Sequence, residues 1–393
     1  MKNINIIFNG QVKTDSMGGG DKIVMNIADK VTDRFNITFL TCPEGRGMLK
    51  NNFENLSGKK LNNIRVSKLG FTFAYILRIL SSPLILFKNI KKDSIVWSAS
   101  DFLPDTMPGF VFKLFHPRSI WISNLFLKAR NPFTKEVNFS LRTLLYFFSQ
   151  RISMFLFKIN CDGVFVLCES DRDFLLSKGL SNVFVLQGGV DTNFYLKVLA
   201  KNPDKYEACF IGRFHYQKGL DDLLYVWQKV VEVNKKAVLA LVGWGGDESV
   251  YNLKKDIEGK NLEKNIKLLG FLDGLEKVKV LKSSKVLLFP STFESWGVVV
   301  AEGIASQTPV VAYDLEVLKH NFPQGVVFAR SFDKDSFVEQ TINLLHNEQL
   351  RDKVVIEGTK LIPKLDWEYS SRVFVDYLNN VVQKSYNIEY GKV

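Results

Sequence analysis

Cysteine and long apolar runs are both scarce in this sequence of 393 residues. Its four cysteines form no CxxC pair and no regular spacing, which predicts reduced thiols and neither disulfides nor a zinc site. The most apolar stretches, 76–87 and 144–157, are interrupted by Arg78 and Arg151. A membrane-spanning helix needs about 18 uninterrupted apolar residues, so none is predicted. Residues 1–8 are too short and too polar for a signal peptide, and a cytoplasmic chain is expected.

Positive charge is in excess, and the excess lies in one half of the chain. The sequence has 52 Lys and Arg residues against 41 Asp and Glu, a formal net charge of +11. Residues 1–200 hold 26 basic and 15 acidic residues, whereas residues 201–393 hold 26 of each. An excess of this kind indicates a phosphate-bearing partner, which includes nucleic acid, a nucleotide or a lipid headgroup.

The basic excess coincides with a concentration of aromatic residues. Residues 71–160 carry 12 basic and 4 acidic residues together with 14 of the 32 phenylalanines. Basic and aromatic residues together favour a surface that faces anionic lipid. The alternative is a Phe-rich core with solvated lysines outside it, and it stays open because no clean basic stripe appears on a helix through 141–158.

Short β-branched runs alternate with helical periodicity, a pattern typical of parallel sheets built from βα units. Two doubly wound, Rossmann-like α/β domains facing across a cleft are the simplest architecture with this pattern. In the first half, strands are expected at 5–8, 37–41, 64–68, 94–97, 119–122, 163–167 and 183–186. In the second half they are expected at 208–211, 237–242, 266–269, 286–289, 310–312 and 326–328.

The boundary between the two domains is expected near residues 187–191, with a polar run at 201–205 as a further linker candidate. The first domain is then 1–187 and the second 188–366. A final helix over 367–385 shows Val373, Tyr377 and Val381 at helical spacing.

Three turns in the second half follow predicted strands, at the sheet edge where parallel α/β sheets bind ligands. The first runs from Gly212 to Gly219 and includes Arg213 and Lys218. Two cations beside helix-terminal amides make a good diphosphate site. Two solvated surface charges are the alternative. The second turn begins at Gly243 and is a weak signal by itself, because glycine suits any tight turn.

The third turn is the strongest signal. Glu294 precedes a helix that starts near Gly297, and Glu302 lies inside that helix. Two carboxylates and the free amides of a helix start suit a ligand rich in hydroxyl groups. A capping or buried, paired carboxylate is an equally good interpretation of Glu302.

Together these turns resemble the donor domain of glycosyltransferase family 4, the group 1 glycosyl transferases, which are retaining enzymes of the GT-B fold. The carrying motif is Glu, seven residues, then Glu, here Glu294 to Glu302. Around it match the segments 289–291, 308–313, 213–218, 270–272, 169–173 and 189–191. The resemblance spans nearly the whole chain and implies that the final helix packs back on an N-terminal, acceptor-binding domain.

The resemblance implies a role for each residue of these turns. Arg213 and Lys218 would bind the diphosphate of a nucleotide-sugar and stabilise the leaving group. Glu294 would contact donor-sugar hydroxyls, Glu302 would hold the ribose, and the segment 270–272 would lie along the base. The remaining donor-binding residues are expected to be Gly19, Gly212, Gly243, Phe271, Leu272, Trp296, Gly297 and Val298.

Candidates in the first half are fewer. Gly18 and Gly19 lie in a glycine run that resembles the family's loop facing donor phosphates and acceptor, although a glycine-rich helix start is the alternative. Asp101 is a candidate on the acceptor side or a helix cap. The family's usual histidine near the reacting carbon is missing, and Asn124 stands in that neighbourhood. Asn124 could orient a hydroxyl but cannot act as a base.

The sequence therefore predicts a retaining hexosyltransferase that uses a UDP- or GDP-linked sugar and a glycan or lipid-linked acceptor. Cell-surface polysaccharide or glycolipid synthesis is the expected setting, without a metal, another cofactor or nucleic acid. An anionic membrane surface stays open as a partner, with peripheral attachment at the inner face of the cell membrane. The alternatives are a catalytically lapsed sugar-nucleotide-binding protein and a soluble glucan or small-molecule glycosyltransferase.

Overall fold

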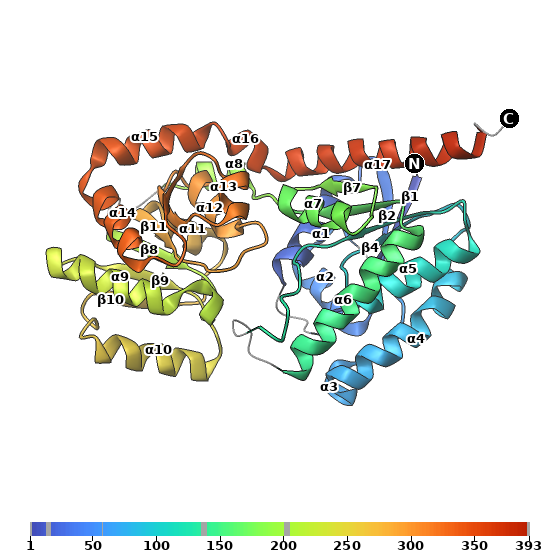
Figure 1. Cartoon of the computed structure of the whole chain (residues 1–393), viewed down its shortest axis with the longest axis horizontal. Helices are drawn as coiled ribbons and strands as arrows, with labels where there is room; N and C mark the ends of the chain where they lie inside the picture. Colours follow the sequence, from blue (N-terminus) through green and yellow to red (C-terminus); the bar gives the residue numbers. More distant parts are fainter. Residues whose placement is uncertain (1, 13–16, 57, 135–139, 200–204, 391–393) are drawn as a thin grey trace. The chain divides into compact units, whose positions relative to one another are not determined.

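The computed structural model describes residues 2–12, 17–56, 58–134, 140–199 and 205–390. The chain forms two compact units (Figure 1). The first contains the residues up to Gln187 together with those from Ser370 onward, and the second is Gly188–Tyr369. Of the predicted linker run at 201–205, all but Lys205 lies outside the described residues.

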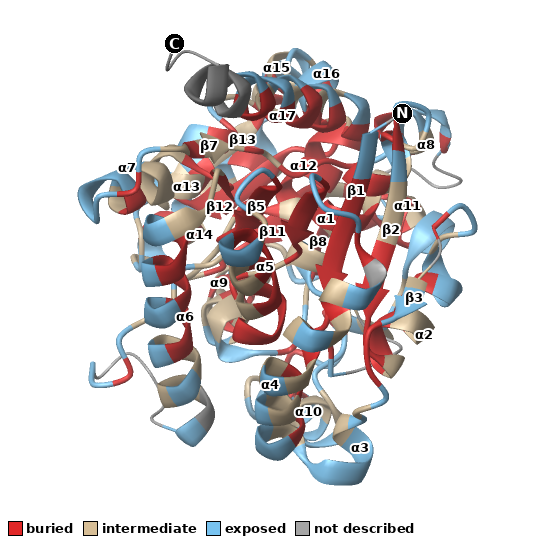
Figure 2. Ribbon diagram, turned by 90° about the vertical axis from the view of Figure 1, so that its right-hand side faces the viewer, coloured by how far each residue is buried: buried red, intermediate tan, exposed pale blue. Residues whose placement is uncertain are grey.

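The first unit is built on a parallel sheet of seven strands in the order β3-β2-β1-β4-β5-β6-β7. Strand β1 is buried from Ile4 onward and ends in the apolar run 6–8, as suits a strand that is covered on both faces (Figure 2). The strands are β1 (Lys2–Phe8), β2 (Phe35–Thr41), β3 (Gly58–Lys60), β4 (Ile95–Ser98), β5 (Ile120–Asn124), β6 (Gly163–Val166) and β7 (Val183–Val185).

The helices of the first unit follow its strands in sequence. In α1 the buried residues Ile23, Val24, Ile27 and Ala28 recur at helical spacing. The helices are α1 (Gly19–Lys30), α2 (Pro43–Asn52), α3 (Val66–Leu69), α4 (Phe71–Asn89), α5 (Leu103–Phe115), α6 (Leu141–Asn160) and α7 (Glu169–Ser177).

The expected strand at 64–68 is wrong. The edge strand is instead Gly58–Lys60, and residues from Val66 form the short helix α3. The carbonyl group of Ile64 accepts a hydrogen bond of 2.7 Å from Arg78, and the amide of Val66 donates to Glu44. Because these backbone groups are hydrogen-bonded to side chains, residues 64–66 cannot pair with a neighbouring strand.

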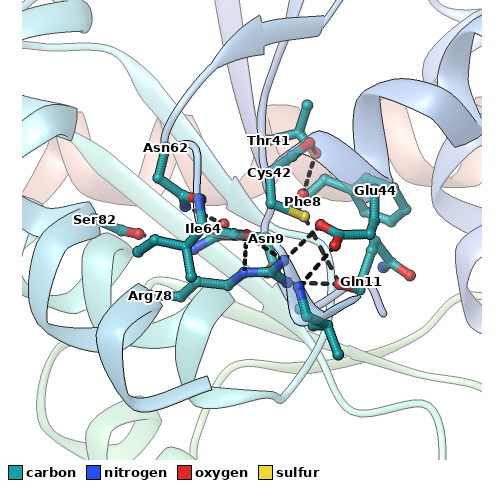
Figure 3. A network of polar contacts seen from close by, with 12 residues as sticks. Phe8, Asn9, Gln11, Thr41, Cys42, Glu44, Asn62, Ile64, Arg78 and Ser82 are labelled. Atoms are coloured by element: carbon teal, nitrogen blue, oxygen red, sulfur yellow. Dashed lines mark hydrogen bonds and ion pairs between the residues drawn. The ribbon is translucent and has the colours of Figure 1, made fainter. Parts of the chain in front are cut away.

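A buried polar network holds the end of β1 (Figure 3). Arg78 of α4 donates to the carbonyl groups of Asn9 and Gln11 at 3.1 and 2.6 Å, and its guanidinium pairs with Glu44 at 2.6 Å. Asn9 also donates to Ser82 on the same helix. A buried charge that lost its partner would destabilise the fold by about 3–5 kcal/mol, so the network fixes the backbone that leads into the glycine run.

Asp105 of α5 anchors the same loop from the other side. Its carboxylate accepts hydrogen bonds from the backbone amides of Asn9 and Gly10, at 2.6 and 2.9 Å. Burial raises the pKa of Asp105 to about 7, although hydrogen bonds from Ser100, Asn9 and Gly10 act in the opposite direction.

The raised pKa of Asp105 predicts a dependence of stability on pH. Between about pH 4 and about pH 7 the folded protein retains a proton that the unfolded chain releases, so the free energy of unfolding falls as pH rises through this window. Buried Asp101, whose pKa is raised to about 6, acts in the same direction. The variant Asp105→Asn should reduce the slope, measured by urea unfolding across the window. Asp29→Asn, at a partly buried carboxylate on α1, is the control, and an unchanged slope for Asp105→Asn would contradict the assignment.

The second unit has a parallel sheet of six strands in the order β10-β9-β8-β11-β12-β13. Counted from its own first strand this is the doubly wound order 3-2-1-4-5-6, with its switch point between β8 and β11. The strands are β8 (Tyr206–Ile211), β9 (Leu239–Val242), β10 (Ile266–Gly270), β11 (Ser284–Phe289), β12 (Val310–Tyr313) and β13 (Val326–Ala329).

Helices surround the second sheet, and α9 buries Leu223, Leu224 and Trp227 in the core beneath it. A short 3-10 helix, η1 (Tyr216–Lys218), precedes α9. The helices of this unit are α8 (Thr192–Lys197), α9 (Leu220–Val233), α10 (Asp247–Gly259), α11 (Gly274–Lys282), α12 (Val298–Ala305), α13 (Glu316–Asn321), α14 (Lys334–His346), α15 (Glu348–Thr359) and α16 (Ile362–Leu365), and only the first residues of α17 (Trp367–Tyr390) belong to it.

Two stretches of chain connect the units, and they lie side by side. The amide of Val190 donates to the Leu365 carbonyl at 2.8 Å, and Thr192 donates to the Asp366 carboxylate. From Ser370 onward α17 belongs to the first unit, where Phe374 stacks on Trp97 with ring centroids 4.6 Å apart. The C-terminal helix is therefore part of the first unit's core.

Candidate functional site

The predicted donor residues gather at the switch point of the second sheet. β8 and β11 are hydrogen-bonded neighbours, and the loops that follow them leave the same edge. The loop after β8 carries Arg213 and Lys218, and the loop after β11 carries Glu294. The topology thus brings together residues about 80 positions apart in the sequence, at the place where doubly wound sheets bind ligands.

Close backbone contacts join these two loops. A Cβ atom on Gly219, whose φ is +68°, would lie 2.0 Å from the Pro290 carbonyl oxygen, so only glycine fits there. Two residues further, the amide of Thr292 donates to the Gln217 carbonyl at 2.9 Å. These contacts hold the cation-bearing loop and the carboxylate-bearing loop in one fixed arrangement.

The loop after β9 joins the same cluster. A Cβ atom on Gly243 would lie 1.8 Å from the Gly212 carbonyl oxygen, and the amide of Phe214 donates to the Trp244 carbonyl at 3.0 Å. Gly243 in turn donates to the Gly270 carbonyl at the end of β10. Exposed aromatic rings follow β9 and β10, namely Trp244 and Phe271.

Lys218 and Glu294 form an ion pair at the centre of this cluster, and both side chains are largely buried. The Lys218 ammonium also lies 5.6 Å from the centroid of the Phe289 ring, at the end of β11. Partial burial strengthens the attraction between the two charges and holds both groups in place. The cation and the carboxylate predicted for donor chemistry are therefore direct neighbours.

The loop after β8 concentrates positive charge. Arg213 is exposed, and the ring of His215 lies 4.3 Å from that of Tyr216. Partial burial lowers the pKa of His215, and the charges of Arg213 and Lys218 lower it further. The neutral imidazole is therefore favoured beside two permanent cations. The sequence contained His215 within a motif but offered no periodicity or spacing that singled it out.

Helix α12 presents its N-terminus beside Glu294. Gly297 is the N-cap residue and supplies no side chain, while its carbonyl accepts the amides of Val300 and Ala301. The amides of Val298 and Val299 are at the helix start, where no intrahelical partner exists. Backbone donors at such a terminus bind anionic or polar oxygens.

Glu302 is buried within α12 and paired. Its carboxylate accepts a hydrogen bond of 2.8 Å from Lys277 of α11, which also pairs with Asp273 at 3.0 Å. Burial lowers the pKa of Lys277, and the attraction of Glu302 and Asp273 overcomes this and raises it. Burial also raises the pKa of Tyr195, and Glu302 adds to that shift. Glu302 is therefore a buried, paired carboxylate in this structure, which is one of the two interpretations that the sequence left open.

Two polar atoms in this region are buried without a hydrogen-bond partner among the described residues. They are the Oγ atom of Ser291, which follows β11, and the Nε1 atom of Trp296. Trp296 packs its ring against Phe322 and against the backbone of Gly188. Ser291 is a site candidate that the sequence offered only as part of a longer motif.

The glycine candidates Gly18 and Gly19 lie in the first unit, at the start of α1. The amide of Gly18 donates to Asp21 at 2.9 Å, and a Cβ atom on Gly19 would meet nothing within 4 Å. Packing within the chain therefore does not require glycine at position 19.

The acceptor-side candidates Asp101 and Asn124 are both buried and hydrogen-bonded inside the first unit, and their role toward an acceptor stays a prediction. Asn124 is fully buried, donates to the carbonyl groups of Ser98 and Ala99, and accepts from Trp97. Asp101 is buried as well and accepts a hydrogen bond of 2.7 Å from Gln150. Asp101 does not cap a helix either, because α5 begins after Phe102. Both side chains hold the interior of the first unit together, since their polar groups are used internally.

The comparison with protein families covers the second unit. Residues 191–361 match the family model described as Glycosyl transferases group 1. The phosphatidyl-myo-inositol mannosyltransferase of Mycobacterium leprae is 30% identical over 162 residues, which are 40% of this chain and 42% of that protein. Its Mycobacterium tuberculosis counterpart (strain H37Rv) is 28% identical over 48% of this chain and 51% of its own length. The chain thus matches about half the length of these relatives, and the resemblance predicted from the motifs is confirmed.

Solved structures of the same fold cover nearly the whole chain. Sucrose-phosphate synthase of Thermosynechococcus elongatus has a TM-score of 0.74 at 14% identity, over 98% of this chain and all of that one. Anabaena Alr3699/HepE in complex with UDP-glucose has a TM-score of 0.71 at 14% identity, over 97% of this chain and 100% of that one. A mutant of S. aureus TarM in complex with fondaparinux, alpha-GlcNAc-glycerol and UDP has a TM-score of 0.72 at 15% identity, over 96% of this chain and 100% of that one. The predicted GT-B fold of two parallel α/β domains is therefore confirmed.

Proposed function

We propose that this protein is a retaining glycosyltransferase that moves a hexose-type sugar from a nucleoside-diphosphate sugar to a glycan or lipid-linked acceptor. The observation that carries the proposal is the Lys218–Glu294 ion pair at the switch point of the second sheet. It lies within the segment that matches the group 1 family model. Polysaccharide or glycolipid synthesis is the proposed setting.

Lys218 and Arg213 are proposed to bind the donor diphosphate. Negative charge grows on the leaving phosphate as the sugar–oxygen bond breaks, and fixed cations stabilise that charge. A diphosphate seated against Lys218 would share its ammonium with Glu294. The Glu294 carboxylate could then accept hydrogen bonds from the sugar hydroxyls, while the α12 amides donate to oxygens beside it.

The remaining donor contacts are proposed by resemblance and by position. Glu302 would hold the ribose, with Lys277 as its counter-charge in the same buried pair. The base would lie along Gly270–Leu272, where the exposed ring of Phe271 offers a stacking surface. UDP and GDP are both compatible with these contacts.

The acceptor proton needs a destination, because the chain lacks the family's usual histidine and Asn124 is held inside the fold. We propose front-face transfer without a protein base. The acceptor oxygen bonds to the anomeric carbon on the side from which the phosphate leaves, and its proton moves to the departing phosphate oxygen. No metal is required in this scheme, and activity should survive chelation.

Removal of Arg213 tests the donor site directly. The variant Arg213→Ala should weaken binding of UDP or GDP by about ten- to a hundredfold, because a charge-assisted contact to phosphate is lost. Isothermal titration calorimetry measures the affinity. Arg330→Ala is the matched control, since Arg330 is an exposed arginine of the same unit that pairs only with a surface carboxylate in the described contacts.

Two outcomes would contradict this proposal. Equal affinity in the Arg213→Ala variant and the wild type would remove Arg213 from the site. No increase in melting temperature with any of a panel of nucleotide-sugars would remove the donor site as a whole. Binding of nucleotide-sugars without release of free nucleotide would instead favour the catalytically lapsed alternative.

A further inference from the structure

Helix α4 is apolar on its outward face as well as on its inward face, and its inward face also buries a charged residue. Its inward face carries Arg78, which is only 2% exposed and bonded to Glu44 and to backbone carbonyl groups. Its outward face carries large apolar side chains, among which Leu80 is 66% and Leu84 is 70% exposed. Folding in water alone favours the opposite arrangement, since burial of apolar area stabilises a fold and burial of charge costs free energy.

Helix α6 likewise buries polar side chains beside its core residues and exposes apolar ones on its outward face. Ser153 and Gln150 point inward, where both bind Asp101. The outward face carries an apolar stripe whose members alternate at spacings of three and four residues, as on one side of a helix. All members are exposed: Leu145, Phe148, Ile152, Phe155 and Ile159.

Helices α4 and α6 belong to one layer. α4 packs against α5, and α5 packs against α6, so α5 lies between them (Figure 1). α5 itself is mostly buried, but Leu114 and Phe115 are exposed at its C-terminal end. Figure 2 shows exposed residues recurring along both α4 and α6. We call the outward apolar residues of α4 and α6, with the end of α5, the apolar face.

The charges beside the apolar face are positive. α4 and α6 contain no Asp or Glu, and the single carboxylate of α5, Asp105, is buried. Lys88, Arg151 and Lys158 are exposed on α4 and α6. The Arg151 guanidinium lies 4.4 Å from the centroid of the Phe147 ring. A second copy of the chain would bring these like charges together, whereas an anionic surface would complement them.

By length and composition alone, residues Phe71–Lys88 of α4 could cross a membrane, and they are the single described segment that meets that test. The contacts of Arg78 argue against a span. Its guanidinium is bound inside the first unit by Glu44, Asn9 and Gln11, so one side of the helix is committed to protein (Figure 3). The other side is free to lie in the plane of a membrane surface.

We propose that the apolar face docks the first unit on an anionic lipid surface, with α4 and α6 lying in the interface. The large side chains enter the boundary between headgroups and acyl chains, and Lys88, Arg151 and Lys158 contact lipid phosphates. This inference rests on the proposed function in one respect, because it assigns the acceptor to a lipid surface rather than to free solution.

Vesicle flotation tests the proposal with the full chain. The wild type should float with vesicles of phosphatidylcholine and phosphatidylglycerol, less so at high salt, and not with phosphatidylcholine alone. A variant combining Leu80→Ser, Leu84→Ser, Phe148→Ser and Phe155→Ser should partition about a hundredfold more weakly. The matched control is Val233→Ser with Ile356→Ser, two exposed apolar residues of the second unit, and it should float like the wild type.

Three outcomes would overturn the proposal: no flotation of the wild type, undiminished flotation of the fourfold variant, or equal flotation of both variants at a reduced level. A wild type that is dimeric without lipid and becomes monomeric in the fourfold variant would assign the face to a second copy. If the fourfold variant fails to fold, Arg151→Glu with Lys158→Glu replaces it and should abolish flotation. UDP binding, measured in parallel, belongs to the second unit, so its loss would count against the proposed function and not against docking.

Discussion

Replacing Lys218 with alanine is expected to lower the turnover of sugar transfer by about a hundred- to a thousandfold. The reason lies in the transition state, where the departing diphosphate gains negative charge. Lys218, which is proposed to bind this diphosphate, is held in place by η1, by the contact of Gly219 with Pro290 and by its pairing with Glu294. A fixed cation needs no reorganisation during the reaction, and water that replaces it would have to reorient.

The measurement is nucleotide release from a donor that binds, at saturating donor concentration, so that kcat is compared separately from KM. Lys279→Ala is the matched control, because it removes another lysine–carboxylate pair of the same unit, between Lys279 and Glu276 on α11. Both variants should keep the wild-type melting temperature within a few degrees. Near-normal turnover in Lys218→Ala would exclude the lysine from leaving-group stabilisation.

Replacing Glu294 with alanine is expected to reduce turnover by a comparable factor, about a hundredfold or more, for a different reason. The carboxylate is proposed to hold donor-sugar hydroxyls so that the anomeric carbon faces the acceptor, and loss of orientation is costly in rate. The variant also leaves Lys218 without its partner and more strongly drawn to the diphosphate. Nucleotide affinity should therefore stay the same or rise while kcat falls.

The conservative variant separates the two effects of Glu294. Glu294→Gln keeps most of the hydrogen bonds and removes the charge, so it should recover part of the activity that Glu294→Ala loses. Glu276→Gln serves as the control on the partner of Lys279. A Glu294→Ala variant with normal kcat and a raised KM would contradict the role in orientation, since only uniform binding would then be lost.

The effects of the two substitutions should not add. Lys218 and Glu294 are in direct contact, and residues that act as a unit show large coupling energies. The double variant Lys218→Ala with Glu294→Ala should therefore be close in turnover to the more impaired single variant. Additive losses would indicate that the two residues serve independent steps.

The sheet could be predicted from the sequence because buried parallel strands leave a local signal. Runs such as 286–289 are continuously apolar, and they form β11. The strand expected at 64–68 has only two β-branched residues among polar ones, and its backbone groups bond instead to Arg78 and Glu44. That competition depends on residues far along the chain, so no local pattern could reveal it.

The site shows the same division between local and distant information. Lys218 and Glu294 follow strands that the sequence placed correctly, so their meeting follows from the sheet order once it is known. The partnership of Glu302 with Lys277 could not be foreseen, because it depends on how α11 packs beside α12. The contacts of Asn124 could not be foreseen for a related reason. Asn124 became a candidate because it stands in the neighbourhood of the family's missing histidine, and no local pattern shows that Trp97, Ser98 and Ala99 use its polar atoms.

The sequence indicated a basic and aromatic region at 71–160 but could not assign the apolar face to particular residues, because α4 and α6 are apolar on more than one side. Periodicity locates an apolar stripe only when the opposite side is polar. In α6 the residues that look core-like, such as Phe148 and Phe155, are exposed, and those that look surface-like, such as Gln150, are buried. The bonds of Gln150 and Ser153 to Asp101 show which side of the helix faces inward.

The two side-by-side connections between the units have a mechanical consequence. A single flexible linker would leave two bodies free to rotate about any axis. Here the stretch through Val190 and the stretch through Asp366 are hydrogen-bonded to each other. We expect this pairing to keep the two stretches together when one of them is cut. After a single proteolytic cut within 187–191, the two fragments should accordingly stay associated. The C-terminal fragment carries α17, which remains packed on the first unit through the stacking of Phe374 on Trp97.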